Sequence, residues 1–185
     1  MSIDKGNDDA MLNYAIMLLK GDGIPMDTKE ASRYFEMAID RGNVDAMNTY
    51  AIILKTGYGV QKNIIDAVRY LKMAIDRGNL NSMFYYANML NEGDGIPVNK
   101  SEAARYFKIS ADNGFVKSMI KYANLVNIGD GVLMDKLEAA KYFKMAADNG
   151  DINSMCDYAI MLDEGDGIPV NKEEAEHYFK MATEH

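Results

Sequence analysis

The sequence contains few of the residues on which disulfide-stabilised proteins and most enzymes depend. It has one cysteine, two histidines, three prolines and no tryptophan. A single cysteine, Cys156, excludes an intramolecular disulfide framework. No apolar run approaches the ~18 residues that cross a bilayer, and the polar N-terminus lacks the apolar segment of a signal peptide. With 15 methionines and one cysteine, we expect a cytoplasmic protein.

Positive charge is also scarce. The chain has 20 basic and 28 acidic residues, which gives a formal net charge of -8. Binding to nucleic-acid phosphates requires clustered lysine and arginine side chains. Attraction to an anionic membrane surface has the same requirement. We therefore expect a protein or peptide partner, and neither a nucleic acid nor a membrane.

A strict internal repeat dominates the sequence. All 15 glycines fall on one 36-residue period. A fixed period of this length is typical of solenoid proteins, in which each repeat packs on its neighbours. The chain is therefore predicted to form a single array, preceded at 1–6 by the remnant of another second helix. The five predicted repeats are residues 7–42, 43–78, 79–114, 115–150 and 151–185.

The first half of each repeat has the apolar spacing of an amphipathic helix, which we call helix A. In the first repeat Met11, Tyr14, Ala15 and Leu18 follow the pattern i, i+3, i+4, i+7, and the pattern recurs in every repeat. This spacing places the side chains on one helix face. A Gly-x-Gly pair then ends the helix, because glycine readily adopts the left-handed backbone of a helix C-terminus.

A second helix, helix B, follows each glycine pair. Its start is marked by an Asp or Asn with an acidic residue three positions later, the pattern of a capped N-terminus. An apolar stripe of alanines and aromatic residues predicts a second buried face, and the next single glycine ends the helix. Neither helix buries its stripe alone, so stacked neighbours are expected to form the core. The five N-cap residues are Asp27, Asn63, Asn99, Asp135 and Asn171.

These features resemble a known family of repeats. Residues 93–114 read GDGIPVNKSEAARYFKISADNG and recur with small variations at 129–150 and 165–182. The segment resembles the Sel1-like repeat, a longer-looped relative of the tetratricopeptide repeat, over essentially the whole chain. The resemblance implies an all-α fold, a right-handed α/α solenoid superhelix of five helix-turn-helix repeats, with an adaptor or scaffold role. Two departures are Tyr-Ala in place of Leu-Gly in helix A, and the absence of the cysteines found in secreted members.

The sequence offers no convincing catalytic centre. His177 aligns with basic helix-surface positions in other repeats, His185 is the last residue, and Cys156 occupies a variable slot without a basic neighbour. The Gly-Asp-Gly loops lack the further residues of dinucleotide, P-loop or EF-hand motifs, so their aspartates are expected to bond the turn backbone. We predict that the protein is not an enzyme and has no catalytic residue, metal ligand or cofactor.

Helix A slots that vary between repeats are candidates for partner binding. By analogy with tetratricopeptide repeats, helix A lines the concave side of the array. Apolar side chains there are predicted to anchor an extended or helical peptide, and asparagines to bond its backbone. The alternative is that the same side chains pack between neighbouring A helices. The predicted residues, called the A-helix row below, are Leu12, Ile16, Asn48, Ile52, Phe84, Asn88, Ile120, Asn124, Ile128 and Ile160.

The two ends of the chain lead to a second hypothesis. Residues 1–7 match residues 37–43, and the sequence stops one residue before the next periodic glycine. Solenoids normally have polar capping repeats, and neither end shows one. The chain is then a fragment of a longer array, or other chains cover its ends, or copies stack end to end. The alternative function is therefore a structural subunit of a larger assembly or filament, which self-associates or contacts neighbours through its ends.

Overall fold

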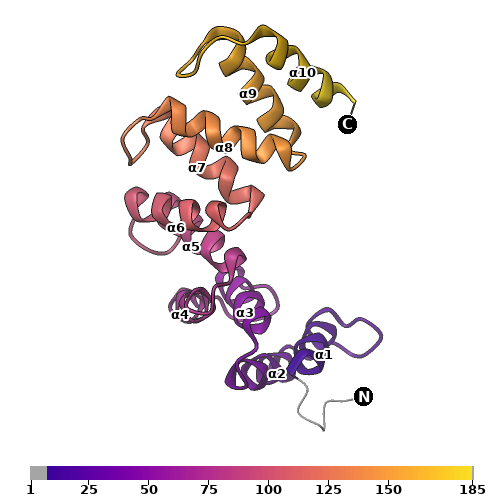
Figure 1. Ribbon diagram of the computed structural model, residues 1–185. Coiled ribbons are helices and arrows are strands. Elements are labelled where there is room, and N and C mark those ends of the chain that lie inside the picture. Colours follow the sequence, from indigo (N-terminus) through magenta and orange to yellow (C-terminus); the bar gives the residue numbers. More distant parts are fainter. Residues whose placement is uncertain (1–7, 185) are drawn as a thin grey trace. The chain divides into compact units, whose positions relative to one another are not determined.

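The computed structural model describes residues 8–184, and within that range it contains ten helices and no strand (Figure 1). The predicted all-α fold is confirmed. The predicted remnant at 1–6 and His185 lie outside the described residues. The A helices are α1 (Asp8–Lys20), α3 (Val44–Thr56), α5 (Leu80–Glu92), α7 (Val116–Ile128) and α9 (Ile152–Glu164). The B helices are α2 (Thr28–Asp40), α4 (Ile64–Ile75), α6 (Lys100–Asp112), α8 (Lys136–Asp148) and α10 (Lys172–Thr183).

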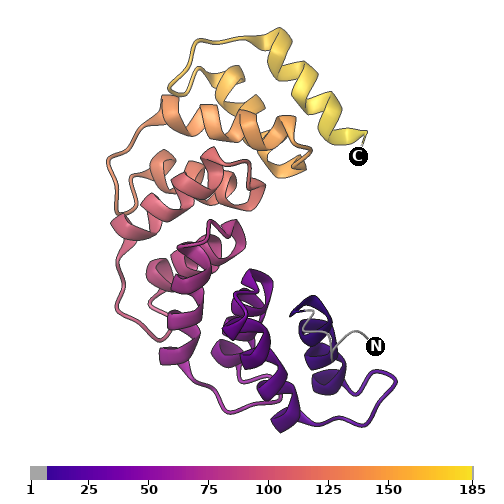
Figure 2. The same cartoon turned by 60° about the horizontal axis from the view of Figure 1, so that its bottom comes forward.

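The helices form two compact units, Met1–Ser82 and Met83–His185, and the division falls in the first turn of α5. In the first unit α1 packs on α2 and α3 packs on α4, while α2 also contacts α3. In the second unit α7 packs on α8 and α9 on α10, and contacts of α6 with α7 and of α8 with α9 join successive pairs (Figure 2). Successive helices thus contact one another from α1 to α4 in the first unit and from α6 to α10 in the second, as a stacked repeat requires.

Two tyrosines join the A and B helices inside every repeat. The Tyr122 and Tyr142 rings meet edge to face, with centroids 4.8 Å apart, an arrangement that aromatic pairs favour. Ala123, which follows Tyr122, and Ala159, which follows the equivalent Tyr158, are fully buried. The expectation that the tyrosines belong to the core is confirmed for seven of the ten, while Tyr14, Tyr34 and Tyr106 are half-buried. The five pairs are Tyr14–Tyr34, Tyr50–Tyr70, Tyr86–Tyr106, Tyr122–Tyr142 and Tyr158–Tyr178.

The predicted N-caps form in all five B helices. In α2 the Asp27 side chain accepts a hydrogen bond from the Glu30 backbone N–H at 2.9 Å. A full capping box would also have the acid bond the N–H of the cap residue. That N–H donates instead to the Leu18 carbonyl, at 3.0 Å. This backbone bond, repeated at the other four caps, ties the start of helix B to the end of helix A.

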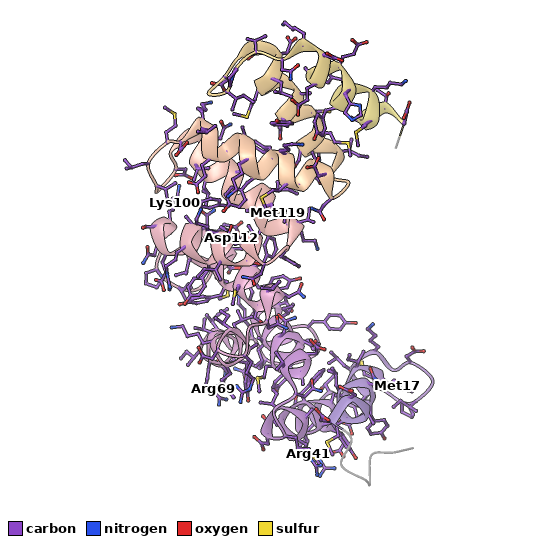
Figure 3. All side chains as sticks on the ribbon, in the orientation of Figure 1. Met17, Arg41, Arg69, Lys100, Asp112 and Met119 are labelled. Carbon is purple, nitrogen blue, oxygen red and sulfur yellow. The ribbon has the colours of Figure 1, made fainter. Side chains whose placement is uncertain are left out.

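The glycine loops pack on the preceding repeat. At Gly131 φ is +77°, and a Cβ atom added there would lie 2.2 Å from Lys100 Cβ. The neighbouring Asp130 accepts from Lys100 Nζ at 2.6 Å, and Asp166 accepts from Lys136 at 2.8 Å. Lys100 begins α6 (Figure 3). The expected bonds from these two aspartates to their own turn are replaced by ion pairs between repeats, because the close approach of the loop brings each lysine within reach.

Two polar clusters link successive repeats of the second unit, and we call them junction clusters. In the first, the Lys108 ammonium donates to the Glu138 carboxylate and, at 3.1 Å, to the Tyr142 hydroxyl. The Tyr142 hydroxyl in turn donates to Asp112, the last residue of α6 (Figure 3). In the second cluster, the Lys144 ammonium donates to the Tyr178 hydroxyl and to Asp148. The Tyr178 hydroxyl also donates to Asp148. Their partners lie about 30 residues apart in the sequence, so the clusters depend on stacking.

The junction clusters predict a loss of stability in alkali. Burial, followed by the hydrogen bond to Asp112, raises the pKa of Tyr142 to about 12. Burial by itself lowers the pKa of Lys108, but its bonds to Glu138 and Tyr142 raise it overall. Both groups bind their protons more tightly in the folded state. Their contribution is therefore complete below about pH 10 and is lost as the pH rises toward 12.

We expect the melting temperature, followed by circular dichroism, to fall between about pH 10 and pH 12. Tyr142→Phe removes the titrating hydroxyl and should make this fall shallower. Tyr58→Phe is the control, because Tyr58 is 57% exposed. Identical slopes for the native chain and Tyr142→Phe would contradict the prediction.

Candidate functional site

The A-helix row is divided between the two units. In the first unit Leu12, Ile16, Asn48 and Ile52 on α1 and α3 are all half-buried. The other six residues lie on α5, α7 and α9 of the second unit. No member of the row is fully buried, so every one retains some surface for contact.

Two members of the row also take part in packing. The Asn48 side-chain oxygen accepts a hydrogen bond from the Ser82 hydroxyl at 2.9 Å, which links α3 to the start of α5. The ring of Phe84 lies 5.9 Å from that of Phe107 and 5.6 Å from that of Phe115. Asn48 and Phe84 therefore contribute to packing between repeats, as the alternative interpretation predicts, and retain only part of their surface for a partner.

The asparagines of the second unit are partly engaged by their own helices. Asn88 donates its amide to the Phe84 carbonyl at 2.8 Å, and Asn124 donates to the Ile120 carbonyl at 2.9 Å. Each bond runs one turn back along the helix. One amide donor of each asparagine is therefore used within its own helix and does not bond a peptide.

The most exposed apolar members of the row lie at the C-terminal half of α7 and on α9. Ile128 is 69% exposed and Ile160 is 43% exposed. In other repeats the slot of Ile128 holds lysine, threonine or glutamate. Large apolar side chains that remain in water are typical of binding surfaces when they gather with polar neighbours.

A small cleft in the second unit brings Asn124 and Ile160 together with groups that the sequence analysis missed. It has a volume of about 130 Å³, and its lining includes Asn127 of α7, Asp157 of α9 and Phe143 of α8. The buried Asn127 Oδ1 accepts no hydrogen bond from any residue in the range 8–184. This oxygen is therefore an unpartnered acceptor, buried beneath the surface of the cleft.

Two acidic residues make the cleft negative. Asp166 is held by Lys136, and Asp157 is half-buried. Burial, and then repulsion from Asp151, raises the pKa of Asp157. The positions of Asn127 and Asp157 also vary between repeats, so the criterion that selected the row would have found them if it had extended to neighbouring slots.

The remaining candidates, His177 and Cys156, are not part of the lining of this cleft. His177 is exposed, as predicted, and Cys156 is half-buried and unpaired. Among residues 8–184 no group of three or more His, Cys, Asp or Glu side chains is placed to hold a metal ion. No helix in the described part of the chain is both long and apolar enough to cross a membrane.

Paired helices with tyrosine contacts inside each pair and polar clusters between pairs define an α-helical repeat protein. The Sel1 repeat model matches five consecutive segments, and the chain belongs to this family. Sel1 repeat proteins are in general scaffolds for protein interactions. The matched frame begins one residue later than the predicted repeats. The segments are residues 8–43, 44–79, 80–115, 116–151 and 152–185.

Solved structures share the fold. A protective antigen of uropathogenic Escherichia coli strains with an SLR fold superposes with a TM-score of 0.91 at 22% identity, over 99% of this chain and 39% of that one. A Sel1 repeat protein from Oxalobacter formigenes gives a TM-score of 0.86 at 22% identity, over 97% of this chain and 74% of that one. This chain thus spans well under half of the E. coli protein. No curated protein matches the sequence significantly.

Proposed function

We propose that this protein is a non-catalytic interaction scaffold that binds a protein or peptide along the A-helix row. The observation that supports this proposal best is the exposure of Ile128 and Ile160, at 69% and 43%. Both stand on the face whose residues differ between repeats, whereas the core positions recur. A binding surface needs such differences, and a stacking surface does not.

The chemistry around these anchors favours a partner with apolar and basic side chains. Asn124 is exposed and lines the same cleft as Ile160, so its amide can bond a partner at the surface. Asp157 and Asp166 line the same cleft, and the whole chain has a net charge of -8. Complementary charge speeds association and selects among partners, while the apolar anchors supply most of the affinity.

Peptides selected from a displayed random library against the native chain provide the test. We expect Ile128→Asp and Ile160→Asp each to weaken binding of the selected peptides by about tenfold or more, since a buried anchor contributes about 2 kcal/mol. Both side chains are exposed, so the melting temperature should stay unchanged. Leu133→Asp is the matched control, because Leu133 is 92% exposed but lies in a loop outside the row. Undiminished binding to both row variants would count against the proposal.

A second candidate function is that of a structural subunit. Phe179 on α10 is 38% exposed, whereas Phe35, Leu71, Phe107 and Phe143 in the same slot are at most 1% exposed. A further helix pair on α10, from another copy or another chain, would cover it. Light scattering over a concentration series tests self-association. A mass that rises above 20.7 kDa and returns to it in Phe179→Asp supports the assembly, and a constant mass contradicts self-association.

A further inference from the structure

The lysine of the junction clusters has no counterpart in the first repeat. The slot holds Lys72, Lys108, Lys144 and Lys180 in repeats two to five, but Glu36 in repeat one. A cation is therefore replaced by an anion at the junction between the first two repeats. This junction lies wholly within the first unit.

The second unit shows what a lysine in this slot contacts. The Lys108 ammonium bonds Glu138 and lies 4.8 Å from the centroid of the Tyr122 ring and 5.0 Å from that of Tyr142. A cation over an aromatic face is attracted by the ring electrons, and a carboxylate adds charge pairing. The cluster is thus a binding site for an ammonium group, and the protein's own Lys108 occupies it.

The first unit has the equivalent tyrosines and acidic residue without the lysine, and the acid, Asp66, is bonded by Asn63 and Arg69. Tyr50, Asp66 and Tyr70 occupy the positions of Tyr122, Glu138 and Tyr142. Together with Glu36 they line a pocket of about 480 Å³. The Tyr50 and Tyr70 rings are 5.6 Å apart and inclined at 43°, whereas the filled cluster has 4.8 Å and 83°. The empty slot thus coincides with a more open pair of rings.

Glu36 is an unpaired acidic residue in this pocket, which Lys62 also lines. It is exposed and makes no hydrogen bond or ion pair with any residue in the range 8–184. After the larger effect of burial, its charge helps to raise the pKa of both Tyr50 and Tyr70. The Glu36 carboxylate therefore acts on both rings of the pocket.

Arg69 at the rim is compatible with a second cation. It lies on α4 (Figure 3), pairs with Asp66 at 3.0 Å, and its guanidinium carbon lies 4.3 Å from the Tyr70 centroid. In the filled cluster the corresponding residue, Lys141, lies 5.2 Å from the Tyr142 centroid while Lys108 occupies its own place near the same ring. One tyrosine thus accommodates both cations.

We infer that the pocket formed by Glu36, Tyr50, Asp66 and Tyr70 binds the ammonium group of a lysine side chain presented by a protein partner. Lysine is favoured because it is the residue that the chain itself places in the filled clusters. The inference goes beyond the proposed function, since the pocket includes no member of the A-helix row. Failure of either proposal leaves the other intact.

The first experiment uses a minimal probe. Acetyl-Gly-Lys-Gly-amide is titrated into the isotope-labelled native chain, and chemical shifts are followed by NMR. We expect saturable shifts at Tyr50 and Tyr70 with a dissociation constant on the order of millimolar. The same peptide with norleucine in place of lysine lacks only the ammonium and should give no saturable shift. Lys62 also lines the pocket, so Lys62→Gln is titrated as well to measure any competition from this side chain.

Glu36→Lys places a lysine in the pocket that lacks one, and Lys144→Glu removes the lysine from a cluster that has one. Glu36→Lys should fill the pocket from within, weaken probe binding by about tenfold or more, and raise the melting temperature by about 2 °C. Glu36→Gln keeps the shape, removes the charge and should weaken binding less. Lys144→Glu should open a second site, with new saturable shifts at Tyr158 and Tyr178.

The outcomes separate the possible occupants. Binding of the lysine probe that Glu36→Lys removes supports the inference. Equal binding of the norleucine peptide, or unchanged lysine binding in Glu36→Lys, overturns it. Tighter binding of the corresponding arginine peptide than of the lysine peptide would overturn the choice of lysine, and absence of saturable shifts in both the native chain and Lys62→Gln would overturn the site.

Discussion

Gly131→Ala is expected to lower the free energy of unfolding by about 3 kcal/mol in urea denaturation. The loss has two physical sources. At φ +77° any L side chain is strained, which costs about 1–2 kcal/mol. The added Cβ would also lie 2.2 Å from Lys100 Cβ and 3.2 Å from the Lys100 carbonyl carbon. The loop must then move away from α6, and the Lys100–Asp130 ion pair must lengthen.

Gly150→Ala separates the two effects. Gly150 has a similar φ of +90°, but an added Cβ meets nothing within 4 Å. This variant should show only the backbone strain, about 1 kcal/mol. If Gly150→Ala destabilises the protein as much as Gly131→Ala does, the close contact with Lys100 adds no energetic cost. The second glycine of each Gly-x-Gly pair is then required only for the backbone conformation of the turn.

Phe143→Ala is expected to destabilise the protein by about 3–5 kcal/mol, because it removes a ring that is only 1% exposed and leaves a cavity in the core. Phe143 also lines the small cleft that includes residues of α7 and α9. Peptides selected on the A-helix row should therefore bind this variant more weakly, even where it remains folded. Urea denaturation measures the first effect and peptide titration the second.

Phe179→Ala is the matched control, because Phe179 occupies the same slot in the fifth repeat and is 38% exposed. We expect a loss of about 1 kcal/mol, in proportion to the smaller area that leaves water. If the loss instead approaches that of Phe143→Ala and grows with protein concentration, another copy covers Phe179. That result would favour the structural-subunit function over the peptide-binding one.

Local features of this protein were predictable because neighbouring residues cause them. The apolar spacing of Met11, Tyr14, Ala15 and Leu18 identified a helix face, and Asp27 and its equivalents identified the caps that the structure confirms. Recurrence every 36 residues then indicated the repeat family. Each of these signals lies within one repeat or in the recurrence of the sequence, so no knowledge of the packing was needed.

Contacts between repeats could not be predicted with the same certainty. Asp130 was assigned to its own turn, but Lys100 reaches it from 30 residues away. Phe84 and Ile128 were assigned to one surface, yet Phe84 packs against two rings while Ile128 is 69% exposed. Phe84 lies in the first half of α5 and Ile128 is the last residue of α7, so the two side chains meet different neighbours.

The sequence by itself determined the helices, their caps, the turns and the family, since these follow from backbone preferences and from spacing within 36 residues. The tertiary structure decided which varying side chains remain in water, which acids pair with which lysines, and where a lysine is missing. The physical reason is that exposure and charge pairing depend on distances across a repeat junction. The substitution of Glu36 for lysine is visible in the sequence, but its consequence appears only when Tyr50, Asp66 and Tyr70 are seen around it.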